Sequence, residues 1–194
     1  GAVAAPTAGM HFSKHLLKRM EIKGIDSAFI TLHAGLGNFR NVDVEDLSKH
    51  KMDSEQYIVS EEAAQMVNTA KGNGHKVVAI GTTVMRTIET AVSTGGMIKP
   101  QEGWTNKFIF PPYDFHFADS LITNFHLPKS TLMMLISAFY NREEVLKIYN
   151  DAVERKYRFF SRCSNHKICK ISCFYFSRKK IGYNQLFLYQ LWLL

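Results

Sequence analysis

The side chains of this chain that could do chemistry gather in the stretch DSLITNFHLPKSTLMML, residues 119–135. There an amide, an imidazole and an ammonium (Asn124, His126 and Lys129) follow an apolar run, and two hydroxyls (Ser130 and Thr131) precede the next one. An imidazole carries protons near neutral pH, and the other groups form hydrogen bonds with anions and hydroxyls. In open α/β sheets, ligands bind beyond the carboxyl ends of strands, where helix N-termini offer free N–H groups. The stretch therefore predicts a binding site between a strand and a helix.

Two further junctions have the same character. GTTVMR follows the apolar run KVVAI and contributes Thr82, Thr83 and Arg86, and PTAGMH near the start contributes Thr7 and His11. Arg86 falls in the first turn of a predicted helix, where the helix dipole disfavours a cation, so an anionic partner is expected beside it. Three such junctions in one small domain favour a shared ligand site.

Several of these residues also have a structural interpretation. Ser130 is a natural helix cap, and His126 lies between Phe125 and Leu127, as a hydrogen-bonded core histidine would. The sequence leaves both interpretations open.

A helix predicted over residues 9–22 places His11, His15 and Lys18 on one face by their i, i+4, i+7 spacing. Two histidines four residues apart can chelate a metal, but the segment lacks the glutamate of the metalloprotease motif and offers no third ligand. No metal site is predicted.

The charge of the chain is concentrated at one end. Six of the 24 Lys and Arg residues, and none of the 17 acids, lie in residues 162–194. The preceding 161 residues therefore carry 18 bases and 17 acids, a net charge of +1, so any nucleic-acid surface on them must be a local patch. All three cysteines also lie in the last stretch, and no signal peptide or spanning segment is visible, which favours a cytoplasmic protein without a membrane anchor.

Strand patterns alternate with helix patterns along the chain. Strands are predicted over 27–33, 76–80, 106–110 and 121–124, and helices over 9–22, 61–71, 84–92, 130–140 and 141–154. This alternation predicts an α/β fold, a mixed and largely parallel sheet flanked by helices. Residues 162–194 show neither periodicity.

The motifs AVAAPTAGMHF, ITLHAGLGNFR, AIGTTVMRTIE, FIFPPYDF, LITNFHLPKSTLMMLISAF and KYRFFS occur in this order. In this respect the chain closely resembles the S-adenosylmethionine:tRNA ribosyltransferase-isomerases of queuosine biosynthesis over residues 1–161. The resemblance implies an enzyme that transfers and isomerises the ribosyl group of S-adenosylmethionine onto 7-aminomethyl-7-deazaguanine at the tRNA wobble position. The products would be epoxyqueuosine-tRNA, adenine and methionine. S-adenosylmethionine is then a substrate, and no separate cofactor is implied.

The resemblance also suggests roles for residues in the matching motifs. The reaction needs a base beside the sulfonium, and three histidines are candidates that the sequence does not rank: His11, His33 and His126. Substrate contacts are expected from Thr7, Gly35, Arg40, Thr82, Thr83, Arg86, Tyr113, Asn124, Lys129, Ser130 and Thr131. Among these, the cations suit phosphates or carboxylates, and Tyr113 suits the sulfonium or a stacked base.

The chain departs from the family pattern at two places. Val84 stands where the family usually has serine, and the resemblance stops after Ser161. Residues 1–161 are therefore predicted to be the C-terminal part of the catalytic domain. Residues 162–194 are predicted to be a non-family basic tail, either frameshifted or disordered.

The chain also starts inside a motif, so an N-terminal part and most of the family's inserted β-barrel are expected to be missing. Three functions remain open: a monomeric transferase fragment acting on tRNA, an inactive fragment that only binds RNA, and a generic nucleotide-binding α/β domain.

Overall fold

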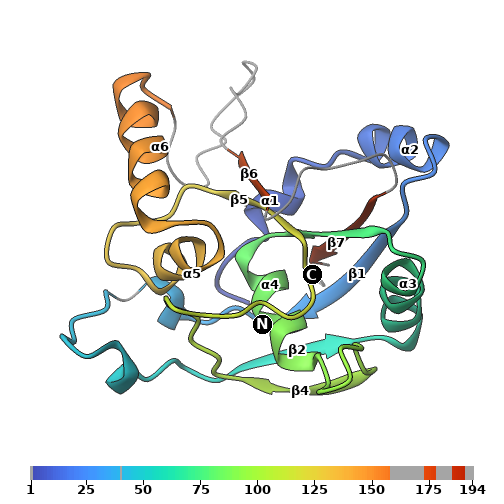
Figure 1. Cartoon of the computed structure of the whole chain (residues 1–194), viewed down its shortest axis with the longest axis horizontal. Helices are drawn as coiled ribbons and strands as arrows, with labels where there is room; N and C mark the ends of the chain where they lie inside the picture. Colours follow the sequence, from blue (N-terminus) through green and yellow to red (C-terminus); the bar gives the residue numbers. More distant parts are fainter. Residues whose placement is uncertain (1, 40, 158–172, 178–184, 191–194) are drawn as a thin grey trace.

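The computed structural model describes residues 2–39, 41–157, 173–177 and 185–190, and its centre is a seven-stranded sheet (Figure 1). The strand order is β4-β2-β1-β7-β3-β5-β6. The strands are β1 (Ser27–Leu32), β2 (Glu55–Val59), β3 (Lys76–Ile80), β4 (Gln101–Thr105), β5 (Ser120–Asn124), β6 (Cys173–Ser177) and β7 (Gln185–Gln190). The pairings β1–β7, β7–β3 and β3–β5 are parallel, and β1–β2, β2–β4 and β5–β6 are antiparallel. The predicted mixed α/β fold is confirmed, but among the described strands only half of the pairings are parallel.

Helices cover both faces of the sheet. They are α1 (Thr7–Met10), α2 (Lys14–Ile22), α3 (Glu61–Gly72), α4 (Thr82–Ala91), α5 (Thr131–Phe139) and α6 (Arg142–Glu154), with 3₁₀ turns at Leu36–Phe39 and Leu47–Lys49. The alternation of side chains along β3 explains the two layers, since successive strand residues point to opposite faces. Val78 and Ile80 pack with α1 and α2, whereas Val77 and Ala79 belong to the larger core formed with α3, α4, α5 and α6.

The N-terminal helical segment differs from the prediction of one helix over residues 9–22. The chain leaves the helix after Met10, and Ser13 starts α2 by accepting a hydrogen bond from the N–H of Leu16. The break separates His11, at the end of α1, from the exposed His15 in α2. The prediction that His11, His15 and Lys18 share one helical face is therefore wrong.

The strand predicted over residues 106–110 is also wrong, because β4 ends at Thr105. Its partner β2 begins at Glu55, which pairs with Thr105, so β2 offers no partner to the residues after Thr105. The Thr105 hydroxyl instead accepts a hydrogen bond from the N–H of Lys107. β2 itself was not predicted.

Two strands lie in the C-terminal segment, for which the sequence predicted no element. β7 lies between β1 and β3, and β6 pairs with β5 at the edge of the sheet. Strand pairing joins main-chain groups, so it does not require an alternating side-chain pattern. The frameshift interpretation of residues 162–194 stays a prediction, and most of that segment lies outside the described residues.

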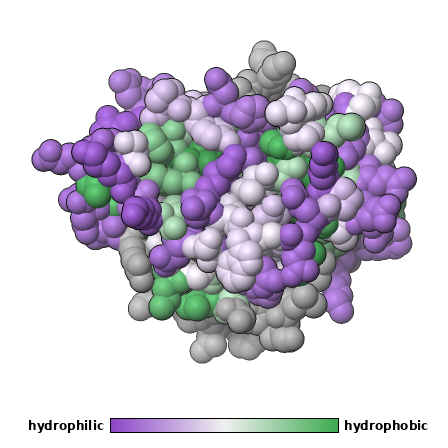
Figure 2. Space-filling view, turned by 90° about the horizontal axis from the view of Figure 1, so that it is seen from below, coloured by the Kyte–Doolittle hydropathy of each residue, from purple (hydrophilic) through white to green (hydrophobic). Residues whose placement is uncertain are grey.

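The face of the molecule shown in Figure 2 is largely hydrophilic, with apolar groups in separate places. Within the described part of the chain, no helix has both the length and the apolar character needed to cross a bilayer.

Candidate functional site

A cavity of about 370 Å³ opens at the carboxyl ends of β3 and β5. Most of its walls come from three places: the segment 3–9 with most of α1, the β3–α4 turn, and the end of β5 with the residues that follow it. Ala34 after β1 and Leu132 in α5 complete them. The lining residues are Val3, Ala4, Ala5, Pro6, Thr7, Ala8, Gly9, Ala34, Ile80, Gly81, Thr82, Thr83, Thr123, Asn124, Phe125, His126 and Leu132. The three polar junctions singled out in the sequence therefore meet at one cavity of a size typical for small-molecule sites.

The N-terminus of α4 forms one wall of the cavity. The turn that leads into α4 needs a backbone conformation that glycine adopts easily. Gly81 has φ +106° and ψ 144°, a backbone conformation that residues with a Cβ rarely adopt. The N–H of Gly81 donates to the carbonyl of Ile122 at 2.8 Å, which ties the turn to β5. Gly81 at the N-cap has no side chain that could cap α4, and the first turn at Thr82 and Thr83 directs N–H groups and the positive end of the helix dipole toward the cavity.

The end of β5 brings two of the candidate histidines close to the cavity. The amide Nδ2 of the buried Asn124 lies 3.4 Å from Nε2 of His11, which places the lone pair of that ring nitrogen toward Asn124. Burial lowers the pKa of His11, so its ring is neutral at pH 7. His126 lines the cavity itself, with Nε2 2.9 Å from the Thr123 hydroxyl.

The backbone of His126 is fixed as well, because its N–H donates to the hydroxyl of Tyr149 at 2.9 Å. Burial lowers the pKa of His126 to about 4 and raises that of Tyr149 to about 12, so both groups are neutral near pH 7. A neutral imidazole at a cavity wall can accept a proton, but a pKa of about 4 makes it a weaker base than an ordinary histidine. Its position in the lining fits the predicted base, and its burial and hydrogen bonds fit a histidine of the core.

His126 is expected to make folding stability depend on pH. Its folded pKa of about 4 lies below the ordinary value, so its contribution is fully present above about pH 6.5 and is lost as the pH falls toward 4. The loss amounts to as much as about 3 kcal/mol, at roughly 1.4 kcal/mol per pKa unit. Denaturant unfolding of the wild type and of His126→Gln at pH 7 and pH 5 measures it. Equal pH dependence in the two proteins would contradict this assignment.

Of the predicted substrate residues after His126, only the side chain of Ser130 has a structural role in the described part of the chain. Ser130 is 3% exposed and caps α5: its Oγ accepts from the N–H of Met133 at 3.2 Å and donates to the carbonyl of Leu127 at 2.7 Å. Thr131 is also buried, and its hydroxyl has no hydrogen-bond partner in the described part of the chain. Lys129 is exposed with φ +58°, and its carbonyl accepts from Val42 N–H at 2.8 Å. Of the three, the exposed Lys129 is best placed to reach a large partner.

Arg86 does find its expected anionic partner, but that partner belongs to the chain. Its Nη2 forms an ion pair with Oε2 of Glu55, and the two side chains are 2% and 3% exposed. The other carboxylate oxygen of Glu55 accepts from the N–H of Gly35 at 2.7 Å. Arg86 and Gly35 are therefore joined through Glu55 and do not line the cavity.

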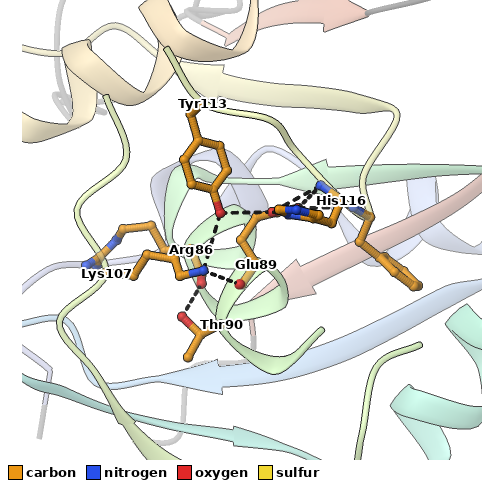
Figure 3. Close-up of polar contacts among 7 residues, drawn as sticks. Arg86, Glu89, Thr90, Lys107, Tyr113 and His116 are labelled. Atoms are coloured by element: carbon orange, nitrogen blue, oxygen red, sulfur yellow. Dashed lines mark hydrogen bonds and ion pairs between the residues drawn. The ribbon is translucent and has the colours of Figure 1, made fainter. Parts of the chain in front are cut away.

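Tyr113 also lies outside the cavity lining, in a half-buried cluster around the buried Glu89 (Figure 3). Its hydroxyl donates to Oε2 of Glu89 at 3.1 Å and accepts from Lys107 Nζ at 3.3 Å. The same carboxylate accepts from the backbone N–H groups of His116 and Phe117 at 3.0 and 3.1 Å. Burial and the Glu89 charge raise the pKa of Tyr113 far above its ordinary range. The cluster fastens residues 113–117 to α4.

The remaining candidates are placed as follows. Thr7 lines the cavity, whereas His33, the residue after β1, does not. Arg40 lies outside the described residues. Val84, where the family usually has serine, is fully buried and is absent from the lining, so a hydroxyl there would not face this cavity without rearrangement.

Sequence reasoning missed Glu55 and Glu89, although a signal existed for the first. In β2 the residues alternate between buried and half-buried, and Glu55 occupies a buried position with Tyr57 and Val59. An acid on the core face of a strand requires a partner. Thr123, which contacts His126, was missed as well.

No group of three or more His, Cys, Asp or Glu side chains is arranged to hold a metal ion within the ranges that the structure describes.

Comparison with known proteins agrees with the resemblance seen in the motifs. A family model described as queuosine biosynthesis protein matches residues 1–162. Relatives named S-adenosylmethionine:tRNA ribosyltransferase-isomerase include one from Phocaeicola vulgatus, 64% identical over 159 residues, which are 82% of this chain and 45% of that protein. Another, from Clostridium kluyveri, is 56% identical over 161 residues, which are 83% of this chain and 47% of that protein.

A solved structure shares the fold. The S-adenosylmethionine tRNA ribosyltransferase from Thermotoga maritima superimposes with a TM-score of 0.63 at 36% sequence identity, over 79% of this chain and 48% of that one. The chain thus spans about half the length of the relatives it matches. Because the family model covers most of the chain, the protein belongs to the queuosine biosynthesis protein family.

Proposed function

We propose that the chain is part of an S-adenosylmethionine:tRNA ribosyltransferase-isomerase that acts in the cytoplasm as a monomer. It would transfer and isomerise the ribosyl group of S-adenosylmethionine onto 7-aminomethyl-7-deazaguanine at the tRNA wobble position, with release of adenine and methionine. The observation that carries the proposal is the convergence of three family motifs, PTAGMH, GTTVMR and NFHLPKST, on one cavity. Family membership and the names of the relatives support the activity.

The cavity offers groups suited to a sulfonium nucleoside. The N-terminus of α4, which begins after a glycine, suits the methionyl carboxylate or the ribose hydroxyls, and Thr82 and Thr83 place hydroxyls in the same wall. Asn124 can hydrogen-bond adenine or ribose. The proton next to the sulfonium would pass to a neutral imidazole, either His126 in the lining or His11 beside Asn124.

Adenine release tests the proposal. The chain would be mixed with S-adenosylmethionine and tRNA carrying 7-aminomethyl-7-deazaguanine, and free adenine would be measured chromatographically against the same mixture with unmodified tRNA. Adenine formed only with the modified tRNA supports the proposal. Binding of that tRNA without adenine release would assign this chain an RNA-binding role alone.

Lys129 is expected to contribute to tRNA binding, because it is exposed three residues after His126 of the cavity lining and its ammonium can neutralise one phosphate. Lys129→Ala should weaken tRNA binding most at low salt, and the salt slope of log K should fall by about 0.7–0.9, as expected for one lost phosphate contact. Lys129→Arg, which retains the charge, is the matched control. A loss of affinity that is the same at every salt concentration would argue against a phosphate contact.

A further inference from the structure

Glu55 connects two walls of the cavity without lining it. One carboxylate oxygen binds Arg86 on α4, and the other binds the N–H of Gly35 in the loop after β1. We infer that Glu55 is a positioning residue, whose carboxylate fixes the Ala34–Gly35 turn relative to α4 and so sets the shape of the cavity. The inference rests on the proposed function where it concerns S-adenosylmethionine.

The helix side of this connection is rigid. Arg86 lies one turn after Thr82 and Thr83, whose helix N-terminus forms a cavity wall. Its side chain is 2% exposed, and a buried ion pair tolerates little displacement because separating the charges leaves each without compensation. Any group that the carboxylate holds is therefore held at a fixed position relative to that wall.

The loop side leads directly to the cavity lining. Gly35 N–H lies 2.7 Å from Oε1 of Glu55, a length typical of a charge-assisted hydrogen bond. The preceding residue, Ala34, lines the cavity and accepts a hydrogen bond from the N–H of Val3 at 2.8 Å. Val3 lines the cavity as well. The Glu55 carboxylate therefore fixes Gly35 and with it the neighbouring Ala34. The hydrogen bond from Val3 to Ala34 extends this connection to the N-terminal segment.

Only a carboxylate satisfies both neighbours, because both are donors. The amide of Glu55→Gln has one accepting oxygen and one donating nitrogen, so its nitrogen must face either the guanidinium or the Gly35 N–H. The double variant Glu55→Leu/Arg86→Met separates positioning from stability. It replaces the buried ion pair by apolar groups of similar size, a change that often leaves the fold as stable, yet it removes the acceptor of the Gly35 N–H.

The first measurement needs no ligand. Hydrogen exchange of the amides at residues 34–37 is expected to be at least tenfold faster in Glu55→Gln and in the double variant, with unchanged protection in β3 and α4. Gly35→Ala is the matched control, since its Cβ would lie 3.8 Å from Oε1 of Glu55, an ordinary contact, and its N–H remains. Unchanged exchange at residues 34–37 in both variants overturns the inference. So does loss of the fold in both, because Glu55 then serves stability.

The second measurement is the dissociation constant for S-adenosylmethionine, by calorimetry, of the wild type, the two variants and Glu154→Ala, whose exposed side chain lies outside the cavity lining. About tenfold weaker binding in the folded variants, with wild-type affinity in Glu154→Ala, supports the inference. Wild-type affinity in the folded double variant overturns it. If the wild type does not bind S-adenosylmethionine, the proposed function fails, and the exchange measurement alone decides whether Glu55 positions the turn.

Discussion

Replacing Glu89 by alanine is expected to lower the free energy of unfolding by about 3–5 kcal/mol, a large part of the stability of an ordinary domain. The Glu89 side chain is fully buried, and its carboxylate accepts hydrogen bonds from the hydroxyl of Tyr113 and from the backbone N–H groups of His116 and Phe117. Without it these donors lose their acceptor, and each buried unsatisfied donor costs about 1–3 kcal/mol. Residues 113–117 would also lose their attachment to α4.

Denaturant unfolding at pH 7 measures this effect. Glu154→Ala is the matched control, because Glu154 is an exposed glutamate at the end of α6, where its removal should change stability by less than about 0.5 kcal/mol. If Glu89→Ala lowers the free energy of unfolding by less than about 1 kcal/mol, the cluster does not hold residues 113–117 against α4.

The second large effect concerns turnover. His126→Ala is expected to lower the rate of adenine release at least about 100-fold, the usual contribution of a positioned proton carrier. The reason is its place in the cavity wall as a neutral imidazole, with its ring held by Thr123 and its backbone by Tyr149. Removing the ring also creates space in a packed wall, so the melting curve has to be recorded alongside the rate.

His75→Ala serves as the control for this experiment, because His75 is exposed and lies outside the cavity lining. A near-normal rate with an unchanged melting curve would return His126 to the role of a core histidine. A loss of rate confined to His11→Ala would then make His11, beside Asn124, the base.

The convergence of the polar junctions could be predicted from the sequence because it follows from local signals. GTTVMR and NFHLPKST each follow a short apolar strand, and the parallel pairing of β3 with β5 brings their carboxyl ends to the same edge of the sheet. Ser130 likewise caps its helix, as its position predicted.

The contacts of Arg86 and Tyr113 could not be predicted, since their partners are distant in sequence. Arg86 meets Glu55 across 31 positions and Tyr113 meets Glu89 across 24, so no local pattern reports either pair. The limits of β4 depend in the same way on where β2 begins. Only the break after Met10 had a local cause, the capping side chain of Ser13, which the sequence reasoning overlooked.

A crystal structure of the chain with S-adenosylmethionine bound would locate the binding site. We expect density for the ligand in the cavity between α1, the N-terminus of α4 and the end of β5, within hydrogen-bonding distance of Asn124 and of Thr82 or Thr83. Density for the ligand in another place, such as the groove between α2 and α3 lined by Leu17, Phe29 and Met66, with this cavity empty, would contradict it.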